Sequence, residues 1–340
     1  MSGPLSENPS LLTTHVDALF DRSVLLAPMA GVNDPVFRSI CLNLGADLCY
    51  TEMISAKGLS FANIKTAELL AIGQSEDRLA VQLFGRDPAI LADQAITITE
   101  RLGDSLALID INMGCPAKKI TSQGEGAALM NDPVLAGRII SQVVAAVSVP
   151  VTVKLRRGWL DGLETAVEFA RIAEVCGAQA VAVHGRWARQ LYQGQADRTV
   201  IGRVKAVVCI PVIASGDVFS VEDALDYFDN QGADAVMVAR GALGNPWLFR
   251  DIKTALLRQA DNNSEAINEK LALIERITVA RQHLLDLAEQ FPHRLVTMRK
   301  HLAWYFKGVK GATAVRRSLY NCHNLADYLR LLDEIMAECL

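Results

Sequence analysis

The 340-residue sequence lacks three features that would each define a class of protein. Its apolar stretches, such as that around residues 178–183, are far too short to span a bilayer. Its first ten residues hold polar side chains and two prolines, without the basic segment and apolar stretch of a signal peptide. None of its seven cysteines forms a CxxC pair, which argues against a zinc site and a disulfide framework. We therefore expect a protein without metal or membrane contact, in a reducing compartment, the cytoplasm.

Acidic residues are absent from one segment near the C-terminus. Seven basic residues and no acidic one lie between Phe291 and Tyr320, although the whole chain has a net charge of −4. Positive charge segregated in this way favours a polyanionic partner. A solvated helix face would give the same pattern, so charge alone leaves both interpretations open.

Eight short apolar runs recur between residues 23 and 240, separated by helix-like stretches. The runs cover residues 24–27, 48–50, 79–83, 106–111, 149–155, 178–183, 210–214 and 235–238. Their Val, Ile and Leu content and weak alternation are typical of strands buried on both faces. Eight such alternations predict a (β/α)8 TIM barrel, in which the functional groups gather at the carboxyl ends of the strands.

A change of pattern after the barrel predicts a second domain. A polar break at residues 261–265 precedes three helix-like stretches, at 266–290, 294–306 and 323–338. We expect an N-terminal extension over 1–20, the barrel over 21–250, and a small C-terminal helical-bundle domain over 251–340. Trp304 and Phe306 lie among the basic residues of this domain, and core packing is their favoured role.

Residues that are polar except for Met29 close the predicted strands and predict an active site at one barrel mouth. The closing residues are Met29, Glu52, Gln82, Asn112, Lys154, His184, Ser215 and Arg240. Cys115 follows the fourth run directly, within the sequence Asn-Met-Gly-Cys-Pro-Ala-Lys-Lys, and a thiol at such a junction is a candidate catalytic group. Burial as a small hydrophobic residue is its alternative role.

Two turns near the end of the predicted barrel favour a phosphate-bearing cofactor. Ser215-Gly216-Asp217 and Ala239-Arg240 follow the seventh and eighth strands, where barrels bind phosphate through backbone N–H groups. Gln82 offers a donor and an acceptor that suit the imide edge of a flavin. Lys154 and His184 offer positive charge or donors where a reduced flavin is negative. Because no strand–GxGxxG–helix unit is present, flavin mononucleotide (FMN) is favoured over a dinucleotide.

The combined motifs resemble those of the tRNA-dihydrouridine synthases, and most of all the bacterial B-type branch. The matching segments are residues 26–34, 81–85, 110–119, 184–186, 215–217, 244–247 and 299–305. The resemblance implies an FMN-bound barrel and a helical domain that together hold tRNA. It also implies that NADPH reduces the flavin, which passes hydride to C6 of a target uracil in the D-loop, while Cys115 protonates C5.

The resemblance also implies roles for individual residues. FMN contacts are expected from Pro28, Met29, Ala30, Gln82, Lys154, Ser215, Gly216, Asp217, Ala239 and Arg240, with Asn112 and His184 lining the flavin and the uracil. RNA contacts are expected from Lys118, Lys119, Arg186, Arg299 and Lys300. An ordinary thiol is mainly protonated at neutral pH, so Cys115 is expected to act as an acid and not as a nucleophile.

Three alternatives remain open from the residues alone. An FMN barrel could act on a free small molecule, although the basic C-terminal segment would then have little use. A Schiff-base aldolase could use Lys154 beside a phosphate site, and would be colourless. A catalytically idle RNA-binding protein would not need eight polar strand ends. The sequence does not identify the target uridine, the oligomeric state or a protein partner.

Overall fold

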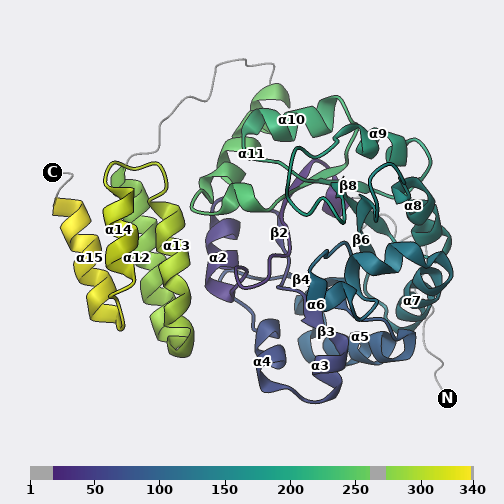
Figure 1. Ribbon diagram of the computed structural model, residues 1–340, viewed down its shortest axis with the longest axis horizontal. Coiled ribbons are helices and arrows are strands. Elements are labelled where there is room, and N and C mark those ends of the chain that lie inside the picture. Colours follow the sequence, from purple (N-terminus) through teal and green to yellow (C-terminus); the bar gives the residue numbers. More distant parts are fainter. Residues whose placement is uncertain (1–17, 261–272, 338–340) are drawn as a thin grey trace.

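A computed structural model describes residues 18–260 and 273–337, which form a barrel and a helical bundle (Figure 1). The sheet is parallel throughout and has the order β2-β1-β9-β8-β7-β6-β5-β4-β3. Its strands are β1 (Ser23–Leu26), β2 (Leu48–Cys49), β3 (Ile54–Ser55), β4 (Leu79–Phe84), β5 (Leu106–Met113), β6 (Val151–Gly158), β7 (Ala180–Trp187), β8 (Val212–Ser215) and β9 (Ala235–Val238).

The two ends of this sheet, β2 and β3, are parts of one interrupted strand. β2 pairs with β1, and β3 pairs with β4. Between them Tyr50 bridges to Ala80, and the Thr51 amide donates to the Ala80 carbonyl at 2.9 Å. The sheet therefore closes into a barrel with eight strand positions, which confirms the predicted fold class.

The barrel interior is packed with side chains. Its core includes Leu25, Tyr50, Leu108 and Met237, which are at most 1% exposed. A larger cluster fills the layer between the sheet and the surrounding helices. A filled interior confines any ligand to the mouth, where the carboxyl ends of the strands lie.

Three of the surrounding helices begin at an Asp-Pro pair. Asp34, Asp87 and Asp132 each accept a backbone N–H of the first turn, and proline fills the first helical position. The carboxylate satisfies amides that have no partner within the helix, and proline has no N–H to leave unsatisfied. The barrel helices are α2 (Pro35–Asn43), α5 (Pro88–Leu102), α7 (Pro133–Ala146), α8 (Ala166–Val175), α9 (Thr199–Lys205), α10 (Val221–Asp229) and α11 (Trp247–Ala260). Shorter helices are α3 (Ala56–Ser60), α4 (Ile64–Ala67) and α6 (Lys118–Thr121).

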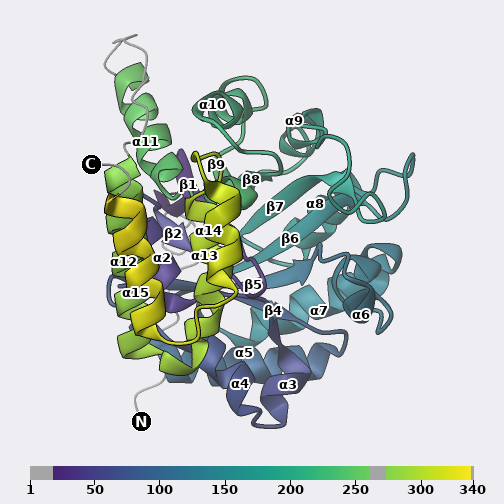
Figure 2. The same cartoon turned by 60° about the vertical axis from the view of Figure 1, so that its left-hand side comes forward.

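Within residues 273–337 the bundle consists of four α-helices, which lie side by side (Figure 2), and one 3₁₀ segment. They are α12 (Leu273–Gln290), the 3₁₀ helix Pro292–Thr297, α13 (Met298–Tyr305), α14 (Ala312–Leu319) and α15 (Leu325–Ala337). The predicted helical bundle is thus present, although α14 is an additional helix. The predicted polar break at 261–265 lies outside the described residues. So do residues 1–17 of the predicted N-terminal extension. None of the helices within 18–260 and 273–337 is long and apolar enough to cross a membrane.

The last barrel helix, α11, lies on both sides of the predicted domain boundary at residue 250. α11 contacts α10 and β1, and its Phe249 and Ile252 belong to the core around the barrel. Since α11 continues to Ala260, we propose that the barrel domain ends after Ala260 and not after residue 250.

The bundle packs closely against α2 and the start of α11. Val36, Ile40 and Trp247 belong to the same apolar cluster as the bundle core. At Gly244, which has a φ of +70°, a Cβ atom would lie 2.2 Å from the backbone of Trp304. This contact needs glycine, because any side chain would separate the two parts. Phe306 is 1% exposed and Trp304 packs on the barrel core, so both aromatics have the predicted packing role.

Candidate active site

Neighbouring strands bring the predicted polar residues together at the mouth. Gln82 on β4 pairs with Asp110 on β5, and Asn112 on β5 pairs with Lys154 on β6. His184 on β7 pairs with Ser215 on β8. These residues lie near the carboxyl ends of their strands, and β5, β6 and β7 extend slightly beyond them. The structure therefore gathers five predicted residues that are far apart in the sequence.

A chain of hydrogen bonds crosses the floor of the mouth. The buried Asp110 carboxylate accepts from Thr152 Oγ1 and from Gln82 Nε2, both at 2.6 Å. Gln82 Oε1 then accepts from Asn112 Nδ2 at 2.7 Å. Because a carboxylate only accepts, Asp110 fixes the amide of Gln82 in one orientation.

The same chain positions Cys115. Asn112 Oδ1 accepts from the backbone amides of Gly114 and Cys115, at 3.1 and 2.9 Å. The Cys115 carbonyl accepts from Ala127 at 3.0 Å. Gly126 lies so close that a Cβ would be 2.7 Å from that carbonyl oxygen. The half-buried thiol therefore lies just past β5, as predicted, on a loop held from both sides.

Burial perturbs the two charged groups at the centre of the mouth. Desolvation raises the pKa of Asp110 to about 6, although its hydrogen bonds from Thr152 and Gln82 oppose the shift. Desolvation lowers the pKa of Lys154 to about 8, and the carboxylate of Asp110 partly offsets it. At pH 7 both groups are mainly charged, and Lys154 Nζ has a long 3.4 Å contact with Ser215 Oγ. An ammonium in this state can bind an anionic ligand.

His184 is neutral in this environment. Burial lowers its pKa well below the ordinary value, and Arg156, Lys154, Arg186 and Arg240 lower it further. Its Nδ1 accepts from the Arg186 amide at 3.3 Å, which places the ring proton on Nε2. The sequence predicts that His184 offers either a positive charge or a hydrogen-bond donor. Because the ring is neutral, only the hydrogen-bond donor remains.

The predicted phosphate turn has the backbone shape that glycine permits. Gly216 has a φ of +119°, and a Cβ there would lie 2.9 Å from Ala196. Tyr227 Oη donates to the Gly216 carbonyl at 2.8 Å and fixes the turn. A cavity of about 530 Å³ beside the turn is lined by residues that include Arg186, Asp217 and Arg240.

Asp217 and Arg186 bind each other, which was not predicted. The guanidinium of Arg186 donates to both carboxylate oxygens of Asp217, at 2.8 and 2.6 Å, and to the carbonyls of Gln193 and Gly194. Arg186 is 2% exposed. Its expected RNA contact is therefore not favoured, since its donors are engaged inside the protein. The Asp217 side chain likewise holds Arg186 and Arg240 in place.

The loops after β1 and β9 form two further parts of the rim. Pro28, Met29 and Ala30 follow β1 and are half-buried or exposed. Asn33 Nδ2 fixes this loop by donating to the carbonyls of Ala27 and Tyr50, both at 2.8 Å. After β9, Ala239 leads into a 3₁₀ turn (Arg240–Ala242). The Arg240 guanidinium there lies over the rings of Tyr192 and Phe219, 4.9 and 5.3 Å from their centres.

The other basic residues expected at RNA fall into two groups. Lys118 and Lys119 are exposed on α6, three and four residues after Cys115. Lys300 donates to the Gly31 carbonyl, and Arg299 donates to the Cys322 carbonyl at 2.9 Å. Both side chains are half-buried; Lys300 joins the bundle to the barrel loop, and Arg299 bonds within the bundle. Because their donors are used inside the protein, the exposed lysines of α6 are the stronger RNA candidates.

Three residues of the site had no predicted role. Asp110, Thr152 and Arg156 hold the mouth together; Arg156 Nε donates to the Gly114 carbonyl at 3.0 Å, beside the thiol. Alternate residues of a strand point to the same face. Asp110 lies two residues before Asn112, and Thr152 lies two residues before Lys154 on the paired strand. This spacing in the sequence is the signal that could have identified Asp110 and Thr152.

Comparisons with known proteins agree with this geometry. The family model of the dihydrouridine synthases (Dus) matches residues 25–339. A probable tRNA-dihydrouridine synthase 1 of Synechocystis is 39% identical over 317 residues, covering 92% of this chain and 86% of that protein. A tRNA-dihydrouridine synthase B of Pasteurella multocida is 39% identical over 297 residues, covering 87% of each.

One solved structure has a similar fold at low identity. Histamine dehydrogenase from Rhizobium sp. 4-9 aligns with a TM-score of 0.51 and 13% identity, covering 77% of this chain and 48% of that one. The likeness concerns the fold alone. The family model matches almost the whole chain, and two relatives are 39% identical to it. This chain therefore belongs to the dihydrouridine synthase family.

Proposed function

We propose that this protein reduces uridines of tRNA to 5,6-dihydrouridine, with FMN in the barrel mouth, NADPH as the reductant and the cytoplasm as its location. The observation that carries the proposal is the placement of Cys115. Its thiol-bearing loop is fixed by Asn112 at the end of the Asp110–Gln82–Asn112 chain, beside the charged Lys154. The two named relatives are tRNA-dihydrouridine synthases, which points to the same reaction.

The residues of the mouth fit FMN. The turn at Gly216 is a cradle that a Cβ would fill, next to the cavity that reaches Arg240. Gln82 has its orientation fixed by Asp110 and retains donor and acceptor capacity for an imide edge. Lys154 and the Nε2–H of His184 would face a region of negative charge. When bound there and reduced by NADPH, the flavin would supply the hydride for C6 of the uracil.

The chain itself supplies the proton and the positioning. Cys115 donates a proton to C5 of the uracil, and its loop is fixed by hydrogen bonds to Asn112 Oδ1 and from the Ala127 amide. A base inside an RNA stack cannot reach this mouth, so the target uridine must be turned outward. Lys118 and Lys119 are exposed on α6, three and four residues after Cys115, and would contact the phosphates near the target base.

Removing the charge of these lysines should weaken tRNA binding without changing the chemistry. For Lys118→Ala and Lys119→Ala we expect a higher KM for tRNA and an unchanged rate at saturation. Each substitution should reduce the slope of log affinity against log salt by about 0.7 to 0.9. Lys205→Ala is the matched control, because Lys205 pairs with Asp234 at the opposite, amino-terminal end of β8. If neither variant changes the salt dependence of tRNA binding, α6 does not contact the RNA.

The charge of Lys154 should make the reaction fall off at alkaline pH. Its pKa in the folded protein is lowered to about 8, so the ammonium is present below this pH and is lost as the pH rises through it. We expect kcat/KM for NADPH to decrease above about pH 8 in the wild type. Asp110→Asn should move this decrease to lower pH, because the carboxylate that favours the ammonium is gone.

Lys154→Gln supplies the control for this assignment. It should lower the rate and abolish the alkaline decrease, since no group with this pKa remains. The profile is measured by the anaerobic rate of flavin reduction between pH 6 and 10. If Lys154→Gln keeps the wild-type profile, the decrease has another origin.

The reaction itself is tested by product analysis. Unmodified tRNA incubated with the protein, FMN and NADPH should yield dihydrouridine on nucleoside mass spectrometry, and free uridine should not. Reduction of free uridine or of small enones at a comparable kcat/KM would favour the small-molecule alternative instead.

A further inference from the structure

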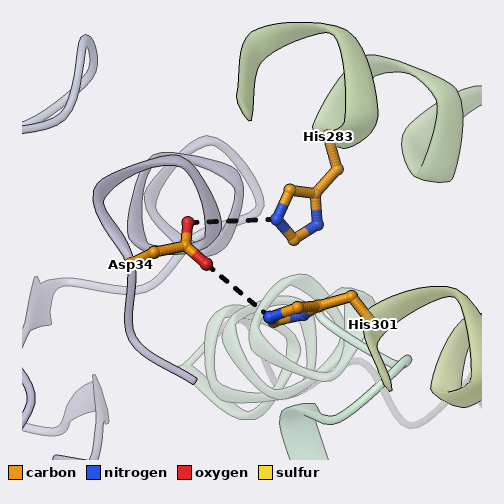
Figure 3. A group of neighbouring side chains, drawn as sticks. All are labelled: Asp34, His283 and His301. Carbon is orange, nitrogen blue, oxygen red and sulfur yellow. Dashed lines mark ion pairs between the residues drawn. The ribbon is translucent and has the colours of Figure 1, made fainter. Parts of the chain in front are cut away.

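A buried polar cluster lies between the barrel and the bundle and includes none of the residues assigned to the active site. Asp34 caps α2 of the barrel, while His283 and His301 come from α12 and α13 of the bundle. Figure 3 shows both imidazole rings directed at the carboxylate. His283 and His301 are 0% and 1% exposed, and Asp34 is 5% exposed.

Direct pairing within the cluster is incomplete. His283 Nε2 lies 3.9 Å from Asp34 Oδ1, and His301 Nε2 lies 3.6 Å from Asp34 Oδ2. Both distances are too long for a hydrogen bond. Both Nε2 atoms are buried without a hydrogen-bond partner, and an unsatisfied buried polar atom costs about 1 to 3 kcal/mol.

Both imidazole rings and the carboxylate meet inside this interface. The centres of the two rings lie 4.6 Å apart. The cluster thus brings together two imidazoles and one carboxylate, side chains that bind divalent metals such as zinc.

The arrangement matches the ligand preferences of a divalent transition metal. All three donor atoms lie within 4.8 Å of one another. Tetrahedral zinc places its ligand atoms about 3.3 Å apart, so small side-chain rotations would close the group around an ion. His283 Nδ1 contacts Tyr305 Oη at 3.1 Å, the kind of outer contact that orients a metal-binding histidine. Asp34 Oδ1 accepts from the Phe37 amide and is oriented as well.

We propose that Asp34, His283 and His301 bind one divalent metal ion, with zinc as the favoured ion, and that this ion clamps the bundle to the barrel. The absence of CxxC pairs predicts no metal site, but these ligands come from three segments far apart in the sequence. The proposal does not depend on the proposed function, because none of the three residues belongs to the barrel mouth.

The first test is elemental analysis of the full-length protein after purification and after exposure to zinc followed by gel filtration. We expect about one zinc per chain and a melting temperature that rises with zinc concentration. His283→Gln and His301→Gln should lose the bound zinc and the thermal shift. His293→Gln is the matched control, since His293 is 57% exposed on its side chain and lies outside the cluster.

X-ray absorption at the zinc edge tests the ligands in the wild type, in case the variants fail to fold. Scattering from two imidazoles and an oxygen ligand, without sulfur, is the expected result. Sulfur ligands, or zinc retained in both cluster variants, would place the ion elsewhere. A wild type that binds neither zinc nor manganese, iron, cobalt or nickel would overturn the proposal.

Discussion

Replacing Cys115 by alanine is expected to slow tRNA reduction by about 10² to 10⁴-fold, the usual contribution of a positioned acid. The thiol is the proton donor proposed for C5, and its loop is held by Asn112 at 2.9 Å. Cys115 takes part in these hydrogen bonds through its backbone amide and carbonyl, which alanine keeps, so the mouth should stay intact. Reduction of the flavin by NADPH should therefore keep its wild-type rate, which stopped-flow absorbance measures separately from turnover with tRNA.

Cys209→Ala is the control for this prediction. Cys209 is an exposed thiol far along the chain, and its loss should change neither step. If Cys115→Ala reduces tRNA within twofold of the wild-type rate, the proton comes from another group. If it also fails to accept electrons from NADPH, the substitution has damaged the cofactor site.

Glu76→Gln is expected to have the largest effect on stability, lowering the free energy of unfolding by about 3 to 5 kcal/mol. Arg38 and Glu76 are almost completely buried and form two parallel hydrogen bonds, at 2.6 and 2.7 Å. Arg38 also donates to the carbonyls of Asn33 and Ala71. Neutralising Glu76 leaves a buried guanidinium without its counter-charge, which is the costly case for a buried pair.

Two comparisons make this prediction specific, both measured by denaturant unfolding. Arg22→Met removes an exposed ion pair with Asp229 and should cost less than about 1 kcal/mol. The double change Arg38→Met with Glu76→Leu should cost clearly less than the sum of the two single changes, because neither charge is stranded. A loss for Glu76→Gln no larger than that for Arg22→Met would show that the pair does not stabilise the fold.

The barrel and most of its helices could be predicted because the residues that begin and end each element favour the same structure as the packing of its apolar residues. One of the helix-like stretches between the apolar runs, at residues 88–102, is α5, because Asp87 and Pro88 define its start and Gly103 its end. The interruption between β2 and β3 was not predictable, because it depends on separate pairing with β1 and β4. α14 was missed because it is short and lies between Gly311 and the turn at Tyr320, so packing on α13 and α15 decides it.

The candidate site was predictable residue by residue, but its internal pairing was not. Gln82, Asn112, Lys154 and Cys115 could be identified because each lies at a predictable strand end. From the sequence, Arg186 is a basic residue that could contact RNA. Its ion pair with Asp217, which only the structure shows, engages its charge inside the protein. Lys300 is similar, since its partner is the carbonyl of Gly31 in a distant loop. A sequence shows charge, whereas the partner of a charge depends on the fold.

The central claim is that electrons pass through this barrel mouth to tRNA, and an anaerobic absorption experiment on the purified protein tests it most directly. The account predicts a flavin spectrum that bleaches when NADPH is added and returns when unmodified tRNA is added. A colourless protein that takes up no FMN, or a reduced flavin that unmodified tRNA does not reoxidise, would contradict it.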